Sequence, residues 1–176
     1  MRNKKKTYAL VAILLAIAAL GIGYAVISSV LQINGEATVL QSDGATVNFV
    51  TSSATHTGGQ TGTDATITSG TAATCTVVLK TLNETATCQY TIKNVSTNNA
   101  LQATGLTATV YEADGTTAWS NSSSEYFTIT STLGATTLAY DATTTVTVTV
   151  TLKKENTTGS NITEQFVVKV DGNTTQ

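Results

Sequence analysis

Cys75 and Cys88 are the residues of this sequence whose type and spacing most readily support covalent chemistry. They lie thirteen positions apart, each on the apolar face of its own predicted strand. In a hairpin of consecutive strands the two thiols would approach one another on the core side, which predicts a disulfide. The open alternative is a pair of buried free thiols. A redox pair fits poorly because the Cys-x-x-Cys spacing is missing.

Other reactive side chains are scattered along the sequence. His56, the single histidine, lies in a Gly/Thr-rich stretch and has no Glu-x-x-His or His-x-x-x-His partner. Several acids fall near predicted turns without EF-hand spacing, so solvated turns explain them better than a calcium site; they are Asp43, Glu112, Asp114 and Asp141. No glycine-rich loop precedes a helix in the manner of a phosphate site. We therefore expect no enzyme, no catalytic or metal-binding residue and no cofactor.

Six Asn-x-Ser/Thr sequences mark possible N-glycosylation sites. With 39 threonines and 13 serines in 176 residues, chance alone gives roughly three such sequences. Threonine richness is therefore an equal alternative to real glycosylation. The candidate asparagines are Asn83, Asn94, Asn121, Asn156, Asn161 and Asn173.

The first thirty residues have the pattern of an export signal. Four of the nine basic residues lie in the first six positions, and residues 8–30 form an uncharged, apolar run. As a helix, this run would span roughly 35 Å, enough to cross a bilayer. We predict a signal peptide at residues 1–25, cut between Ala25 and Val26; the alternative is an uncleaved signal anchor. Cleavage leaves five bases and eleven acids, a net charge of 5 − 11 = −6, which disfavours nucleic acid as a partner.

After residue 30 the apolar residues alternate with polar ones, the period of a strand with one buried face. Alternation recurs in residues 31–39, 46–49, 75–80, 87–93, 106–110, 127–129, 145–152 and 162–170. Turn residues separate these segments, and none of them has a helical period. The pattern predicts an all-β fold, an antiparallel β-sandwich (jelly-roll or Ig-like) of about eight or nine strands over residues 41–176. Residues 52–70 are expected to form a flexible loop with one short strand at 65–68.

The basic start, the apolar run ending Gly-Ile-Gly-Tyr-Ala and the segment Leu-Gln-Ile-Asn-Gly-Glu-Ala-Thr-Val at 31–39 resemble the TasA/camelysin-type secreted fibre-forming proteins. Residues 77–94, 126–129 and 144–152 resemble later strands of that family. Archaeal bundling pilus and surface-thread subunits share this architecture. The cysteine pair and the missing Pro-Gly in the first hairpin turn depart from the common pattern.

The resemblance implies a subunit of an extracellular, cell-surface filament (a pilus or a biofilm matrix fibre). Residues 26–40 would be the donor strand, exchanged into the next subunit to give a head-to-tail homopolymer. Such a subunit would contact the membrane only through its signal segment before cleavage. The residues expected to enter the groove are Leu31, Ile33, Ala37 and Val39, with Gly35 permitting close backbone approach.

Two alternatives to the filament subunit stay open. In the first, residues 31–40 are an ordinary first strand, and the protein is a membrane-anchored monomeric adhesion or binding module with a self-complemented sandwich. In the second, the protein is a secreted metallopeptidase, which is weakly supported because there is no His-Glu-x-x-His sequence.

Overall fold

The computed structural model describes residues 31–39, 46–157 and 162–175. These contain ten strands: β1 (Leu31–Val39), β2 (Val47–Phe49), β3 (Thr55–Gly58), β4 (Asp64–Ser69), β5 (Ala72–Leu79), β6 (Thr85–Asn94), β7 (Gln102–Glu112), β8 (Phe127–Leu133), β9 (Thr143–Leu152) and β10 (Ile162–Thr175). No membrane-crossing helix is found among the described residues. The predicted signal segment 1–25, its cleavage site at Ala25 and Val26, Asp43 and Asn161 lie outside the described ranges.

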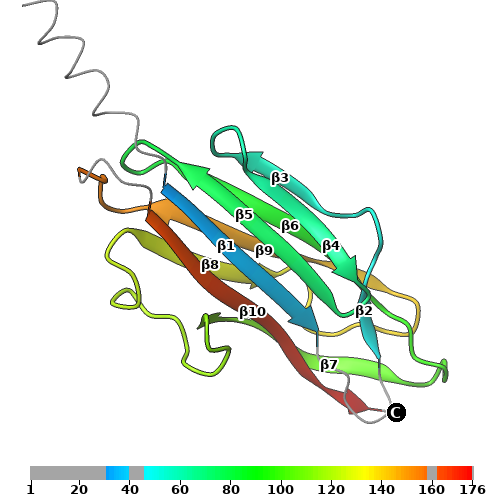
Figure 1. Ribbon diagram of the computed structural model, residues 1–176. Coiled ribbons are helices and arrows are strands. Elements are labelled where there is room, and N and C mark those ends of the chain that lie inside the picture. The colour runs from blue at the N-terminus through cyan, green and yellow to red at the C-terminus, as the bar shows by residue number, and fades with distance from the viewer. Residues whose placement is uncertain (1–30, 40–45, 158–161, 176) are drawn as a thin grey trace, which may run out of the picture.

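The strands form two sheets that face one another (Figure 1). Sheet I has the order β4-β5-β1-β10-β7, and sheet II has the order β2-β6-β9-β8, with β3 pairing β6 beside β2. The prediction of an all-β sandwich is confirmed. The described strands number ten rather than eight or nine, because β3 was not expected.

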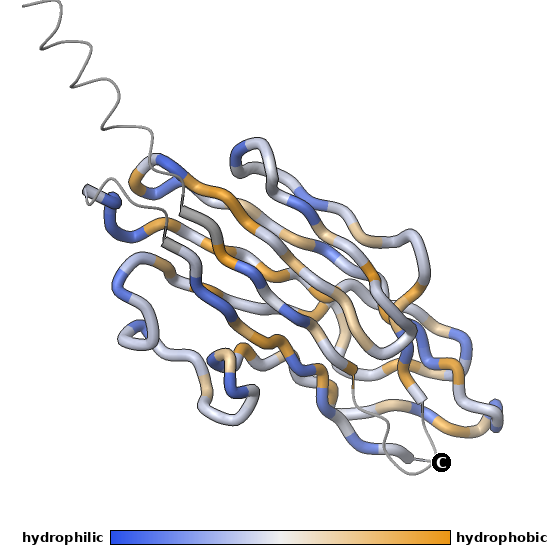
Figure 2. The backbone as a smooth tube through the Cα atoms, viewed as in Figure 1, coloured by the Kyte–Doolittle hydropathy of each residue, from blue (hydrophilic) through white to orange (hydrophobic). Residues whose placement is uncertain are grey.

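Alternation along each strand builds the core between the sheets. In β9, Val146, Val148 and Val150 are fully buried, while the intervening threonines face outward with exposed or half-buried side chains. The same alternation of apolar and polar positions is visible along the other strands in Figure 2. Threonine suits these positions because its β-branched side chain favours extended backbone and its hydroxyl favours the wet face.

The segment expected to be a flexible loop contains two strands. β4 corresponds to the short strand predicted at 65–68, but β3 was missed. All four residues of β3 are exposed, so it has no apolar face for a periodicity argument to detect. Its cause is backbone pairing: β2 covers only residues 92–94 of β6 on this edge, and β3 pairs residues 86–89.

One ladder departs from the antiparallel prediction. β1 pairs with β5 in antiparallel register from Leu31↔Leu79 to Thr38↔Ala72, but its other edge pairs with β10 in parallel, from Leu31↔Ile162 to Val39↔Val170. Side-chain alternation is identical in parallel and antiparallel strands, so the sequence pattern could not distinguish them. The first and last strands of the described domain are therefore neighbours in the centre of sheet I.

Candidate functional site: the groove occupied by strand β1

Strand β1 fills a groove between β5 and β10, and both of its edges carry backbone ladders. Its inward-facing residues match the predicted set: Ile33, Ala37 and Val39 are 0%, 2% and 5% exposed, and Gly35 is also buried. The side chain of Leu31 lies outside the described part. In this single chain these residues enter the core of their own sandwich.

Gly35 makes room for an aromatic ring. It is the direct neighbour of Phe166 on β10 and of Cys75 on β5. A Cβ added at Gly35 would lie 2.1, 2.3 and 2.5 Å from three outer atoms of the Phe166 ring, which is far inside van der Waals contact. Phe166 is only 2% exposed, so the ring cannot move into solvent without loss of burial. The groove therefore selects glycine at this position of any strand that fills it.

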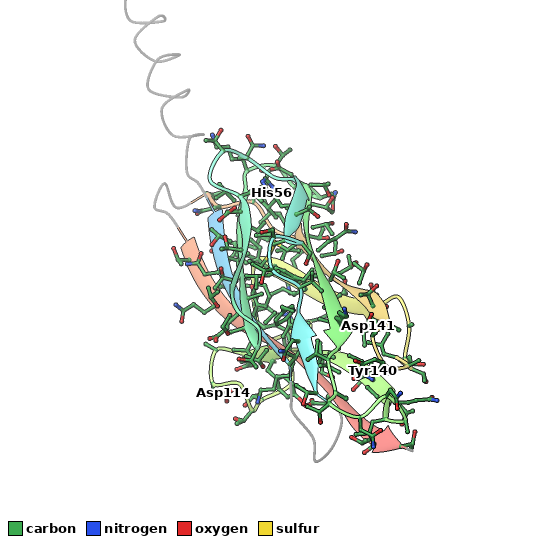
Figure 3. All side chains as sticks on the ribbon, turned by 90° about the vertical axis from the view of Figure 1, so that its right-hand side faces the viewer. His56, Asp114, Tyr140 and Asp141 are labelled. Carbon is green, nitrogen blue, oxygen red and sulfur yellow. A yellow bond between two sulfur atoms is a disulfide. The ribbon has the colours of Figure 1, made fainter. Side chains whose placement is uncertain are left out.

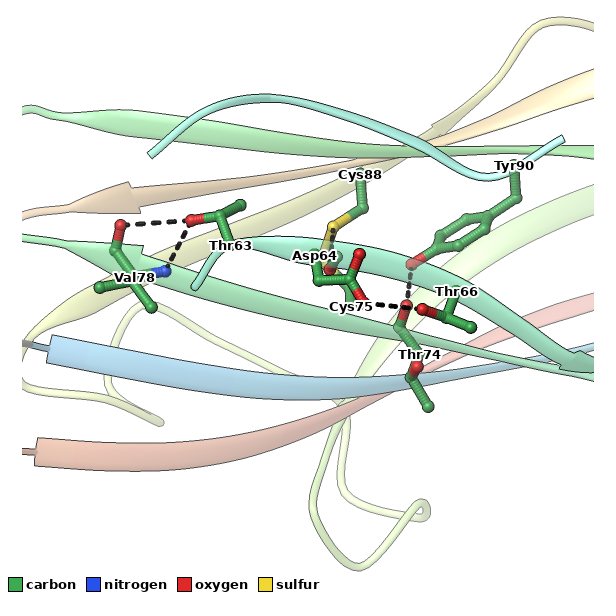
Figure 4. Close-up of a disulfide and its surroundings, with 8 residues drawn as sticks. All are labelled: Thr63, Asp64, Thr66, Thr74, Cys75, Val78, Cys88 and Tyr90. Carbon is green, nitrogen blue, oxygen red and sulfur yellow. Dashed lines mark hydrogen bonds between the residues drawn. A yellow bond between two sulfur atoms is a disulfide. The ribbon is translucent and has the colours of Figure 1, made fainter. Parts of the chain in front are cut away.

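The predicted disulfide between Cys75 and Cys88 is present, with the Cα atoms 6.0 Å apart. The hairpin expected to bring the cysteines together is wrong, however: Cys75 lies on β5 of sheet I and Cys88 on β6 of sheet II. The bond crosses the core from one sheet to the other (Figure 4). β5 and β6 follow one another in sequence, yet each pairs with other strands, because β1 and β9 occupy the neighbouring positions.

Tyr90 reinforces the connection between the sheets beside the disulfide. Its ring is fully buried and lies edge-on to Phe49 at 5.7 Å. Its hydroxyl donates a 2.7 Å hydrogen bond to the backbone oxygen of Thr74 on β5, as Figure 4 shows. Burial, with a smaller contribution from the negative charge of Asp64, raises the pKa of Tyr90 well above its ordinary value. Tyr90 therefore acts as a neutral donor that fixes the wall of the groove.

The candidate glycosylation sites differ in their surroundings. Asn94 is fully buried, and its side-chain nitrogen donates to the backbone oxygens of Leu101 and Leu138 at 3.1 and 3.0 Å. Its side-chain oxygen accepts from the backbone N–H of Ser96 at 3.1 Å. The folded domain thus has no room for a glycan on Asn94, whose threonine-rich context misled the sequence pattern. Asn156 is half-buried, and the exposed candidates are Asn83, Asn121 and Asn173.

The chemistry-bearing residues outside the groove are dispersed over the surface (Figure 3). His56 is exposed on β3. Asp114 closes a turn by accepting hydrogen bonds from Thr117 and Thr116, which hold its pKa below the ordinary value. Asp141 pairs with Lys93 at 2.5 Å. Within the described ranges, no three His, Cys, Asp or Glu side chains gather into a group suited to a metal ion.

Glu164, near the start of β10, is the acid of this region whose protonation the fold shifts most clearly upward. Burial raises its pKa above the ordinary value, although a hydrogen bond with Ser124 and the positive charge of Lys153 act in the opposite direction. Its neighbour in the ladder is the buried Ile33 of β1. The entrance to the groove therefore carries a carboxyl group that is unfavourable when ionised.

The fold and the groove define a β-sandwich domain with an inter-sheet disulfide and a centrally inserted N-terminal strand. Comparison with protein-family models finds no match, and comparison with curated proteins finds none either. Sequence reasoning found the inward-facing residues of β1 and the disulfide partners. It missed the contact of Phe166 with Gly35, for which the one signal was a glycine in the middle of a strictly alternating strand.

Proposed function

We propose that this protein is a secreted structural subunit that polymerises into an extracellular filament by donating β1 to the groove of the next copy. The observation that carries the proposal is the position of β1: it is the first strand described, yet it lies in the centre of a sheet with ladders on both edges. Only its connection to β2 joins it to the rest of the described domain. It can therefore leave its groove without any part of the chain being threaded through another.

Exchange of β1 between copies would preserve its contacts. The same inward-facing residues would meet the same β5 and β10 of a neighbour, so that the two arrangements differ mainly in linker conformation and in the entropy of association. The chain between Val39 and Val47 makes eight Cα–Cα steps, which span at most about 29 Å when extended. A strand of nine residues is itself about 30 Å long, so a neighbour stacked end to end lies within reach.

Such an exchange does not close on itself. Each copy gives one strand and accepts one, through two different surfaces, and a contact of this kind produces an open filament unless a rotation closes it into a ring. The disulfide fits an oxidising, extracytoplasmic location. The resemblance of residues 31–39 to the TasA/camelysin-type fibre proteins agrees with the same proposal.

A second candidate function is a membrane-anchored, monomeric surface adhesion or binding module. It is favoured by one observation: β1 occupies the groove of its own chain in this structure. The uncleaved apolar segment would then be the anchor, and the sandwich would need no partner.

Disulfide trapping distinguishes the two functions. Thr38 on β1 and Ala72 on β5 are direct ladder partners, and both side chains are half-buried. The full chain carrying Thr38→Cys and Ala72→Cys is exported, oxidised mildly and run on a denaturing gel without reductant. Strand exchange joins each copy covalently to the next and gives a ladder of multimers that reductant collapses. A self-complemented monomer gives a single band with an internal cross-link.

The two single variants are the matched controls, because neither can join a ladder beyond a dimer. Negative-stain microscopy of the same samples relates the gel to filaments. A double variant that is fully cross-linked yet runs only as a monomer, under conditions in which the wild type is concentrated, would refute the filament proposal in favour of the second function.

A further inference from the structure

The inference concerns how the groove survives when β1 is out of it, and it rests on the function proposed above. In the order β4-β5-β1-β10-β7, β1 is the only strand that connects the β4–β5 hairpin to the other half of sheet I. When β1 leaves, this hairpin loses its backbone ladder to β10. A subunit that waits for a donor strand must nevertheless keep β5 in place.

The vacant groove has a specific way to fail. β5 is antiparallel to β1, and β1 is parallel to β10, so β5 and β10 run antiparallel to each other. Both would present unpaired edges, and antiparallel edges can pair directly. An open groove requires them to stay about two strand spacings, roughly 10 Å, apart. Direct pairing of β5 with β10 would therefore close the groove to a donor strand.

We infer that the Cys75–Cys88 disulfide holds the groove open by anchoring β5 to sheet II while β1 is absent. Cys75 lies in the middle of β5, directly beside Gly35 in the ladder, and the bond reaches Cys88 on β6 across the core. It is the one covalent tie between the β4–β5 hairpin and the opposite sheet. A move of β5 by one strand position toward β10 would carry Cys75 away from Cys88 by about 5 Å, which an intact disulfide does not permit.

Hydrogen bonds alone give weaker anchorage for the hairpin. Beside the disulfide, Tyr90 donates to the backbone oxygen of Thr74. At the two ends of β5, the backbone N–H of Phe49 donates to Gly70 and that of Gln60 donates to Val78, at 2.7 and 2.8 Å. Each of these bonds can exchange with water when the hairpin moves. With β1 in place the ladder also holds β5, so the closed domain depends on the disulfide less than the vacated one.

The test measures uptake of a donor strand by a vacated groove. The full chain receives a protease site between residues 40 and 45 and is cut after folding, so that β1 can dissociate. A fluorescent peptide with the sequence of residues 31–39 is added in excess, and its uptake is followed by anisotropy. The compared proteins are the oxidised wild type, the Cys75→Ala/Cys88→Ala variant and, as a matched control, Val148→Ala.

Val148 is fully buried on β9 and is the ladder partner of Cys88, so its truncation destabilises the core without releasing β5. We expect the wild type and Val148→Ala to take up the peptide, and the cysteine-free variant to take up at least about ten-fold less. That variant should still be folded before cutting, as circular dichroism will report. Equal uptake by the cysteine-free variant would overturn the inference and leave the filament proposal intact. No uptake by any variant would overturn strand exchange itself and, with it, the vacated state that the disulfide is inferred to protect.

Discussion

Phe166 and Gly35 form the contact through which the groove should be most sensitive to a single methyl group. Replacement of Gly35 by alanine puts a Cβ between 2.1 and 2.5 Å from three ring atoms of Phe166. Overpacking of this kind costs typically 1–3 kcal/mol, and the lower backbone entropy of alanine in the unfolded chain returns roughly 0.5–1 kcal/mol. We expect Gly35→Ala to lower the free energy of unfolding by about 1–2 kcal/mol.

Phe166→Leu should relieve that clash. Leucine lacks the three outer ring atoms that the new Cβ would meet, but the change alone removes about three buried carbons, worth about 2 kcal/mol. If the two effects were independent, the double variant would lose about 3–4 kcal/mol. Because leucine leaves space for the methyl group, we expect the double variant to lose only about 2 kcal/mol, a coupling of at least about 1 kcal/mol.

Urea unfolding followed by tryptophan fluorescence measures all four proteins, since Trp119 is the single tryptophan and packs against the core. Additive losses in the double variant, or an unchanged midpoint for Gly35→Ala alone, would show that β1 does not occupy the groove in this register. Either result would contradict the structural argument for the groove.

The same pair of variants tests where the contact is made. In strand exchange, a Gly35→Ala strand fits the groove of a Phe166→Leu copy, while the unaltered strand of that copy fits the unaltered groove of the other. A mixture of the two single variants should therefore form filaments that melt at a higher temperature than those of either variant alone. In a self-complemented monomer each chain keeps its own defect, and the melting curve of the mixture is the sum of its components.

Three further predictions follow from other parts of the molecule. Asn94→Ala should cost about 3 kcal/mol or more in thermal or urea unfolding, because it leaves the buried oxygens of Leu101 and Leu138 without a donor; a loss below about 1 kcal/mol would contradict this. Glu164→Gln should raise stability at neutral pH. Burial raises the folded pKa of Glu164, so the wild type loses stability as the pH rises through that pKa; the difference in urea midpoint should vanish near about pH 3, where the carboxyl is protonated in both states. In a host that glycosylates asparagine, glycopeptide mass spectrometry should find glycans at the exposed sites and none at Asn94; a glycan there on folded protein would refute the buried geometry. The exposed sites are Asn83, Asn121 and Asn173.

The sequence by itself determined which side of each strand is buried. Alternation is a local property, since successive side chains of a strand point to opposite faces, and it correctly predicted the buried face of β1 and the threonine-covered outer face of β9. The count of two cysteines on apolar faces likewise left one intramolecular pairing, which the structure contains. The exposed β3 escaped prediction because its cause is an unpaired edge of β6.

Only the tertiary structure decided which strands are neighbours. Strand pairing joins segments far apart in the chain, and neither parallel direction nor sheet membership leaves a mark on side-chain alternation. Hence the sequence could not reveal that β1 lies between β5 and β10, that the disulfide connects two sheets, or that the ring of Phe166 fills the space over Gly35. These three features together make the groove, because each depends on residues brought together by folding and not by their order in the chain.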